Sequence, residues 1–289
     1  MHIPKFATFS IVARDEKTGE IGIAGTTHWF GYAKNVPYIQ AGVGAVATQA
    51  STNPFYGTEG IKELKKTNNA QGTLATILKK APDAKGIFQV IIVDKDGNTA
   101  GHTGKNTIHY ADHITEKNVA FAGNFLANEN VLLAMQRYYQ TSTEPFGLKL
   151  IKTLQQGQEA GGDIRGKKSA ALKVSSINET KNSLETIQYD LQIDDNDDPL
   201  KELERQYFVA KSFHFLNLAT DSNIYEQQVL YFEKALEIYP QNSEALFWYA
   251  VTCWKNNEKE KAEKLKQQLF QNFSKNWEEL WKRLPLTNS

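Results

Sequence analysis

Hydrophobic and polar positions follow two different patterns along the chain, and the pattern changes near residue 200. Before that point, short apolar runs bounded by Gly, Pro, Asn or Asp predict strands. These strands are expected at 8–15, 21–27, 88–93, 99–103, 107–114, 118–122, 169–174 and 187–193, with two more within 36–50. Apolar residues at helical spacing predict two helices within 54–80 and one each at 127–141 and 145–156. Hairpin-linked strands with paired helices indicate an α+β fold built in layers.

From about residue 200 to 284 the helical period continues almost unbroken, and no strand pattern occurs. The acidic cluster that ends in Pro199 is a typical helix start. Farther on, Phe232, Ala235 and Pro240 stand at the offsets of the second helix of a tetratricopeptide repeat. We therefore predict an α+β domain over residues 1–218 and an all-α, tetratricopeptide-like tail over 219–289.

The repeat pattern in this tail is incomplete. Ala250 and Ala262 fall at the small-residue positions of a next unit, but Gln228 stands where the first unit needs a small residue. The pattern therefore predicts one and a half degenerate repeats, which are enough for a helical hairpin and too few for a solenoid. The aromatic side chains of the tail are expected to pack between helices, and surplus apolar surface would serve self-association or a protein partner.

The composition is that of an ordinary globular protein, with 289 residues, 40% hydrophobic and 23% charged. Lys plus Arg and Asp plus Glu both number 33, so charge gives no support for nucleic acid or a membrane as a partner. The single cysteine, Cys253, excludes an intramolecular disulfide and a Cys-based zinc cluster. No apolar run approaches the ~20 residues of a membrane helix. Met1–Ala7 is too short and polar for a signal peptide, so the expected location is cytoplasmic, although an exported protein that has lost its signal would give the same pattern.

A hydroxyl residue, Thr8, stands at the head of the first predicted strand. One class of hydrolase uses such a residue as its nucleophile when it is the true N-terminus, with its own α-amine as the base. An α-amine suits this role because its pKa is about 7.7–8.0, close to neutral. By itself the pattern is weak evidence, since Thr is common in strands.

Several motifs strengthen the case because they occur in the order found in a known family. They are Thr8–Asp15, Ala41–Gln49, Asn53-Pro54, His102–Gly104, Gly123-Asn124, Gly161–Ala171 and Leu191–Leu203. On these residues the chain resembles, over roughly residues 7–215, the family catalogued as domain of unknown function 1028. That family is similar to the N-terminal-nucleophile (Ntn) hydrolases. The resemblance implies a four-layer αββα sandwich and a nucleophilic role for Thr8.

The chain departs from the family pattern at its start. Members that begin Met-Thr expose the Thr when Met is removed, whereas Met1–Ala7 precedes Thr8 here. The nitrogen of Thr8 is then an amide and no base. Either Met1–Ala7 is cleaved off, or the chain is an inactive or differently working member.

Thr48, Gln49 and Asn53 form a polar set where a strand runs into a helix. Asn53 is explained as a helix cap, whereas Gln49 has no such structural role. We assign Gln49 and Asn124, with Thr8, to the catalytic set, and Thr48 and Asn53 to substrate binding. For Asn124, a role in a turn is the alternative to donating a hydrogen bond to an oxyanion.

The histidines are further candidates. We assign His28, at the end of the second strand, and His102, in a His-Thr-Gly motif, to substrate binding; for His28, a surface or core role is the alternative. His102, His109 and His113 also suggest a metal site. The nearby carboxylate of Asp112 would point to the opposite face from His109 and His113, so we predict no metal.

Asp163 and Arg165 lie in the densest polar constellation, Gly161–Gly166, and are assigned to substrate binding. They would either pair with each other to fix a glycine turn or present the guanidinium to a substrate carboxylate. Two glycine-flanked turns, at 22–25 and 42–44, either expose backbone N–H groups to an oxyanion or allow tight strand packing.

The sequence as a whole predicts an Ntn-type amidohydrolase that acts on an amide bond of a small molecule or peptide and needs no cofactor. The alternative is a non-catalytic binding protein that keeps the fold and recruits partners through its helical tail. A free amine on Thr8 is required by the first hypothesis and irrelevant to the second.

Overall fold

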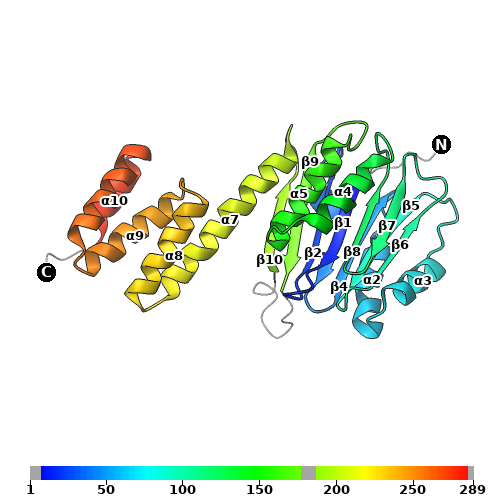
Figure 1. The fold of residues 1–289 in the computed structure, drawn as a ribbon, viewed down its shortest axis with the longest axis horizontal. Helices are drawn as coiled ribbons and strands as arrows, with labels where there is room; N and C mark the ends of the chain where they lie inside the picture. Colours follow the sequence, from blue (N-terminus) through cyan, green and yellow to red (C-terminus); the bar gives the residue numbers. More distant parts are fainter. Residues whose placement is uncertain (1–7, 177–186, 286–289) are drawn as a thin grey trace. The chain divides into compact units, whose positions relative to one another are not determined.

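The computed structural model describes residues 8–176 and 187–285, which form two compact units, one up to Glu204 and one from Arg205 onwards (Figure 1). Helix α7 (Pro199–Asp221) contains the division, and the boundary expected at residue 218 falls in the same helix.

The first unit contains two antiparallel sheets. Their strands are β1 (Thr8–Arg14), β2 (Ile21–Thr27), β3 (Pro37–Gln40), β4 (Gly44–Ala50), β5 (Phe88–Asp94), β6 (Thr99–Thr103), β7 (Asp112–Glu116), β8 (Val119–Gly123), β9 (Ser169–Ser175) and β10 (Ile187–Ile193). One sheet has six strands in the order β10-β9-β2-β1-β8-β7, and the other has four in the order β3-β4-β5-β6. A mixed fold of helices and antiparallel strands was predicted and is confirmed.

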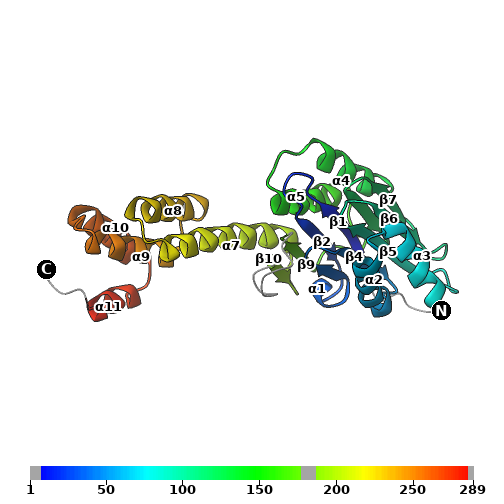
Figure 2. The same ribbon diagram turned by 90° about the horizontal axis from the view of Figure 1, so that it is seen from below.

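The two sheets face each other, because β1 and β2 contact β4 and β8 contacts β5. The helices of this unit are α1 (Tyr32–Asn35), α2 (Pro54–Thr67), α3 (Ala70–Lys80), α4 (Asn130–Thr141) and α5 (Phe146–Glu159). Helices α2 and α3 pack on the four-stranded sheet, and α4 and α5 pack on the six-stranded one (Figure 2). The helix pairs were predicted from periodicity; the short α1 was not.

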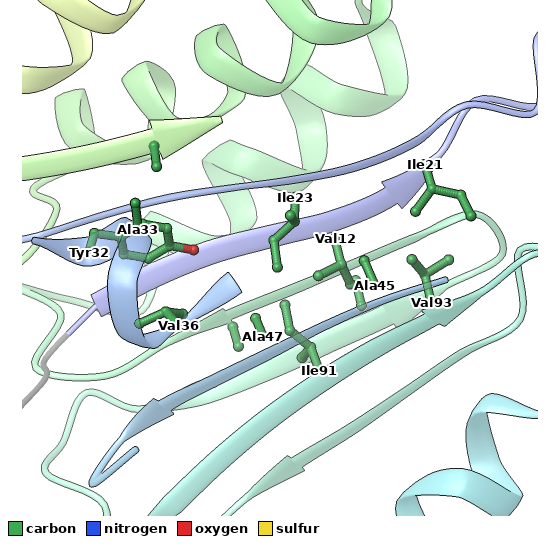
Figure 3. Packing of buried hydrophobic residues seen from close by; sticks show 13 residues of the cluster. Val12, Ile21, Ile23, Tyr32, Ala33, Val36, Ala45, Ala47, Ile91 and Val93 are labelled. Carbon is green, nitrogen blue, oxygen red and sulfur yellow. The ribbon is translucent and has the colours of Figure 1, made fainter. Parts of the chain in front are cut away.

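The space between the sheets is filled by side chains that alternate along the strands. Val12, Ile23, Ala47 and Ile91 are fully buried there, in one cluster (Figure 3). Full burial of a Val or Ile side chain stabilises the fold by about 1.5–3 kcal/mol. Because of this alternation, polar residues that lie an even number of positions farther along the same strand also face this interior.

One predicted strand is shorter than expected. β7 begins at Asp112 rather than at Thr107, because β8 ends at Gly123 and pairs no farther than Asp112. The preceding segment bonds instead to the loop after β8, where Phe125 N donates to Ile108 O at 3.1 Å.

The second unit is helical. It contains the rest of α7 with α8 (Tyr225–Ile238), α9 (Ser243–Lys255), α10 (Lys259–Asn272) and α11 (Asn276–Arg283). Phe232 and Tyr249 stack in its core, where Cys253 is also buried. None of the helices within the described ranges has the length and apolarity needed to cross a bilayer.

Candidate functional site

A buried polar network occupies one end of the first unit, between its two sheets. Thr8 begins β1 and pairs with Thr27 at the end of β2, while Asn124 directly follows β8. On the facing sheet, Gln49 near the end of β4 pairs with Gln89 near the start of β5. Strand alternation turns Thr8 to the same side as Val12, and Gln49 to the same side as Ala47. The interior polar residues therefore converge at this end.

The backbone of Thr8 is held by three hydrogen bonds. Its carbonyl oxygen accepts from Asn124 N at 3.0 Å, from Asn124 Nδ2 at 3.3 Å and from Gln49 Nε2 at 3.3 Å. Its side chain is fully buried, and its Oγ1 has no hydrogen-bond partner among the described residues. Thus the residue is fixed in place while its hydroxyl is left without a structural role. The three predicted catalytic residues meet here.

Gln89 is the hub of the network. Its Oε1 accepts from Gln49 Nε2 at 2.6 Å and from Asn124 Nδ2 at 3.1 Å. Its Nε2 lies 2.9 Å from each of three acceptors, Thr103 Oγ1 and the carbonyl oxygens of Asp112 and Gly123. One buried amide thus joins strands of both sheets.

Ser10 and Tyr32 extend the network under β1. Ser10 Oγ donates to Gln49 Oε1 at 2.6 Å, so its lone proton is used there. The Tyr32 hydroxyl, 3.0 Å away, must then donate to Ser10 Oγ. Burial raises the pKa of Tyr32, which keeps the hydroxyl protonated as this bond requires. Gly25 makes room for the ring, since a Cβ at this position would lie 2.2 Å from the Tyr32 hydroxyl.

His113 joins the network from β7. Its Nδ1 lies 2.8 Å from Thr103 Oγ1. The pKa of His113 is lowered, first by burial and also by His102, while Asp112 raises it. The neutral imidazole is therefore favoured at this end of the sheets.

Three predicted substrate-binding residues lie away from the network. His102 occupies the opposite face of β6 from Thr103, and its Nε2 lies 3.0 Å from Asp83 Oδ2. Thr48 likewise faces away from Gln49, and its Oγ1 accepts from Asn53 N. Asn53 caps α2 by accepting from Phe55 N, as its structural interpretation predicted. These contacts account for the three side chains without a ligand.

Asp163 and Arg165 form the ion pair that was one of two alternatives. Arg165 Nε and Nη2 donate to Asp163 Oδ1 at 3.1 Å and Oδ2 at 2.8 Å. Asp163 Oδ2 also accepts a hydrogen bond from the backbone N of His28 at 3.3 Å. The backbone of Asp163 forms an isolated antiparallel β-bridge with Leu126. The pair fixes this turn beside the network, and His28 stands at its edge with a buried Nδ1 that no described residue contacts by a hydrogen bond.

Within residues 8–176 and 187–285, no group of three or more His, Cys, Asp or Glu side chains is placed to hold a metal ion. His102 lies against Asp83, whereas His113 lies against Thr103.

Sequence reasoning missed the hub. Gln89 lies in the run Phe88–Asp94, where the pattern indicated only a buried strand. A buried strand with a lone amide near its start was a usable signal, because a buried amide must find partners for both ends. Ser10 and Thr103 gave no comparable signal, since Ser and Thr are ordinary in strands.

Two family models match separate parts of the chain. A model for a family of unknown function, DUF1028, matches residues 8–203, and a tetratricopeptide-repeat model matches residues 231–264. A crystal structure of a DUF1028 protein from Silicibacter pomeroyi is similar, with 27% sequence identity and a TM-score of 0.63 over 70% of this chain and 84% of that chain. No curated protein matches.

Proposed function

The chain belongs to the DUF1028 family, and from this premise we propose that its first unit is an Ntn-type amidohydrolase, acting on an amide bond of a small molecule or peptide. Two facing antiparallel sheets with helix pairs on their outer faces agree with the four-layer αββα sandwich of Ntn hydrolases. The step from fold to activity is an analogy. The observation that carries the proposal is the hydroxyl of Thr8, which is buried at the head of β1 and without a hydrogen-bond partner in the described ranges.

The proposed reaction begins with hydrolysis of the peptide bond between Ala7 and Thr8, in which water adds to the Ala7 carbonyl, Ala7 leaves as a carboxylate and the amine of Thr8 is freed. Thr8 Oγ1 attacks the carbonyl carbon of the substrate amide, and the amine takes the hydroxyl proton and passes it to the leaving nitrogen. The C–N bond breaks and an ester to Thr8 remains. The same amine then deprotonates a water molecule, which attacks the ester and releases the acid. Thr8 Oγ1 recovers its proton.

Gln49 and Asn124 are positioning residues in this scheme. Both donate to the carbonyl oxygen of Thr8, so they fix the backbone that carries the nucleophile and the amine. Asn124 Oδ1 is buried and lacks a partner within the described part of the chain, so it is an acceptor for an amine liberated at Thr8.

The test starts with the mass and N-terminal sequence of the protein from its native host. A chain that begins at Thr8 is expected, and it should be acylated once by a β-lactone probe, whose ring opens as Thr8 Oγ1 forms the ester. Thr8→Ser should keep the label and Thr8→Ala should lose it. Thr73→Ala is the matched control, because the Thr73 side chain is equally buried and its Oγ1 also lacks a partner in the part described.

A native chain that keeps Met1 or His2 would overturn this mechanism. The second candidate function is then a binding protein that keeps the fold and recruits a protein partner through its tail. The tetratricopeptide match at 231–264 favours it. Deletion of the tail should abolish co-purification of such a partner while the Thr8→Ala variant retains it.

A further inference from the structure

A cavity of about 290 Å³ lies between β7 and the start of α4. Its floor is apolar, with Leu126 at 2% and Leu132 at 3% exposure. Its mouth carries the carboxylates of Asp112 and Glu129, both on exposed residues. The cavity is therefore apolar inside and acidic at its entrance.

The cavity opens at the same end of the sheet as Thr8. Asp112 pairs with Gly123, and Gly123 pairs with Phe9, the residue after Thr8. Two strand spacings separate β7 from β1, which is about 10 Å. The backbone carbonyl of Asp112 accepts from Gln89 of the buried network, whereas the Asp112 side chain lines the cavity on the other face of the sheet.

Exposed apolar side chains surround this end. Among the described residues of the first unit, the exposed large hydrophobic side chains are Trp29, Phe30, Ile108, Tyr110, Leu133 and Ile164. Their loops are joined by backbone bonds, since Leu126 N donates to Tyr110 O and Ile164 N to Phe125 O. Leu133 lines the cavity itself. Exposed apolar residues gathered in this way are typical of a ligand-binding surface.

The charges at the mouth select among apolar ligands. The residues that line the cavity include two carboxylates and one histidine, His109, but no Lys or Arg. The ring of Tyr110, 42% exposed at the same mouth, offers a face to a cation. A ligand with a carboxylate at this position would be repelled.

We infer that this cavity binds an apolar group that carries a positive charge, the chemistry shared by an arylalkylamine and by the apolar N-terminal residue of a peptide. The apolar part would fill the floor of Leu126 and Leu132, and the ammonium would lie between Asp112 and Glu129. The inference stands apart from the proposed function, because Asp112 shares its face of the sheet with Phe9, and the Thr8 side chain lies on the opposite face.

The test measures binding to the full chain carrying Thr8→Ala, so that its result does not depend on catalysis or on release of Met1–Ala7. The probes are the cations phenethylamine and phenylalanine amide, the neutral N-acetylphenylalanine amide and the anion 3-phenylpropionate. Their binding is measured by ligand-observed NMR. The two cations should bind at least tenfold more tightly than the anion. Phe-Gly-Gly-amide binding more tightly than phenethylamine would identify the peptide as the source of the ammonium.

The double variant Asp112→Asn, Glu129→Gln should lose the preference for cations, and Glu16→Gln, an exposed carboxylate outside the lining of the cavity, should keep it. Equal binding of cationic and anionic probes, an unchanged preference in the double variant, or no binding of any probe would overturn the inference. A chain that never exposes Thr8 yet binds the cations would refute the proposed function and leave this inference standing.

Discussion

Gln49 and Gln89 stand opposite each other on neighbouring strands, and Gln49 Nε2 donates to Gln89 Oε1 at 2.6 Å. The orientation of both amides follows from their other partners. Gln89 Nε2 faces the carbonyl oxygens of Asp112 and Gly123, which can only accept, so its Oε1 must face Gln49. Gln49 then has its Oε1 free to accept from Ser10.

These fixed orientations give the interior polar groups one consistent pattern of donors and acceptors. The pattern runs from the carbonyl of Gly123 through both glutamines to the carbonyl of Thr8. Because a buried amide left unpaired is costly, each link holds the next in place. The network therefore fixes Thr8 from the facing sheet as well as from β8.

Replacement of the hub should be among the most damaging single changes in the first unit. Gln89→Leu keeps the volume approximately but leaves two carbonyls and two amide groups without their partner. We expect a loss of about 3–5 kcal/mol in the free energy of unfolding. Urea unfolding with hydrogen exchange of the β4 and β5 amides measures it.

The matched control for this change is Gln71→Leu. Gln71 is exposed, and its Nε2 donates a hydrogen bond to Thr99 O at 3.3 Å. Its replacement should cost no more than about 0.5 kcal/mol. Similar losses for the two variants would contradict the role given to Gln89.

Ser10 and Tyr32 should show measurable coupling. Tyr32→Phe removes the donor to Ser10 Oγ and should cost about 1 kcal/mol. Ser10→Ala should cost more, about 2 kcal/mol, because it leaves both the Tyr32 hydroxyl and Gln49 Oε1 without a partner. In the double variant the losses should fall short of additivity by about 0.5–1.5 kcal/mol. Additive losses in urea unfolding would show that the hydroxyl bond contributes nothing.

The second unit offers an independent prediction. Asn242 caps α9 by accepting from Ala245 N, and its Nδ2 donates to buried Ser212 Oγ. Asn242→Ala should destabilise this unit by about 1–2 kcal/mol. Tryptophan fluorescence reports it, because Trp248 lies in the same helix.

The control is Asn69→Ala. Asn69 caps α3 of the first unit in the same way, by accepting from Gly72 N. The Asn69→Ala substitution should leave the midpoint of the unfolding transition of the second unit, as measured by fluorescence, unchanged. A shift of that transition as large as the one from Asn242→Ala would mean that the two units unfold together.

The hydrophobic pattern was sufficient for most of the fold because the strands of the two sheets are bounded by turn residues. β6 and β10 have the predicted limits. The pattern failed at Thr107–Ala111, whose partners lie in a loop rather than in a strand. Periodicity describes a segment by itself and carries no information on where a neighbouring strand ends.

The site was predictable only in part for a similar reason. Thr8 begins β1, Gln49 lies near the end of β4 and Asn124 follows β8, so three residues that the motifs had named lie together at one end of the sheets. His102 was assigned to the same place, but strand alternation turns it towards Asp83. Its neighbour Thr103 and the hub Gln89 face the interior instead. Which face of a sheet a residue points to depends on the exact position and pairing of its strand, and the sequence does not fix these.

The remaining prediction concerns pH, and it follows from the contact between His113 Nδ1 and Thr103 Oγ1. Gln89 Nε2 can only donate, so Thr103 Oγ1 accepts from it and keeps its own proton, which is available to an unprotonated Nδ1. Donation from Thr103 to Nδ1 takes place only with a neutral imidazole. It agrees with the lowered pKa of His113, for which burial is the largest cause, while His102 also lowers the pKa and Asp112 raises it.

The sign of the effect follows from proton linkage. Below the usual pKa of 6.5 the unfolded chain takes up a proton that the folded chain resists. The stability of the first unit should therefore be complete above about pH 6.5. It should decline as the pH falls from there to the lowered pKa of the folded state. His113→Asn keeps a polar side chain near Thr103 but cannot titrate, so it should flatten the dependence of the free energy of unfolding between about pH 7.5 and pH 5.5.

His214→Asn is the matched control, because His214 is exposed on α7 and belongs to no part of this network. It should leave the slope unchanged. Urea unfolding at several pH values, followed by hydrogen exchange of the β6 and β8 amides, gives the slope for each variant. An unaltered slope in His113→Asn would mean that His113 does not supply the pH dependence. A flattened slope would identify this histidine as the titrating member of the network that holds Thr8.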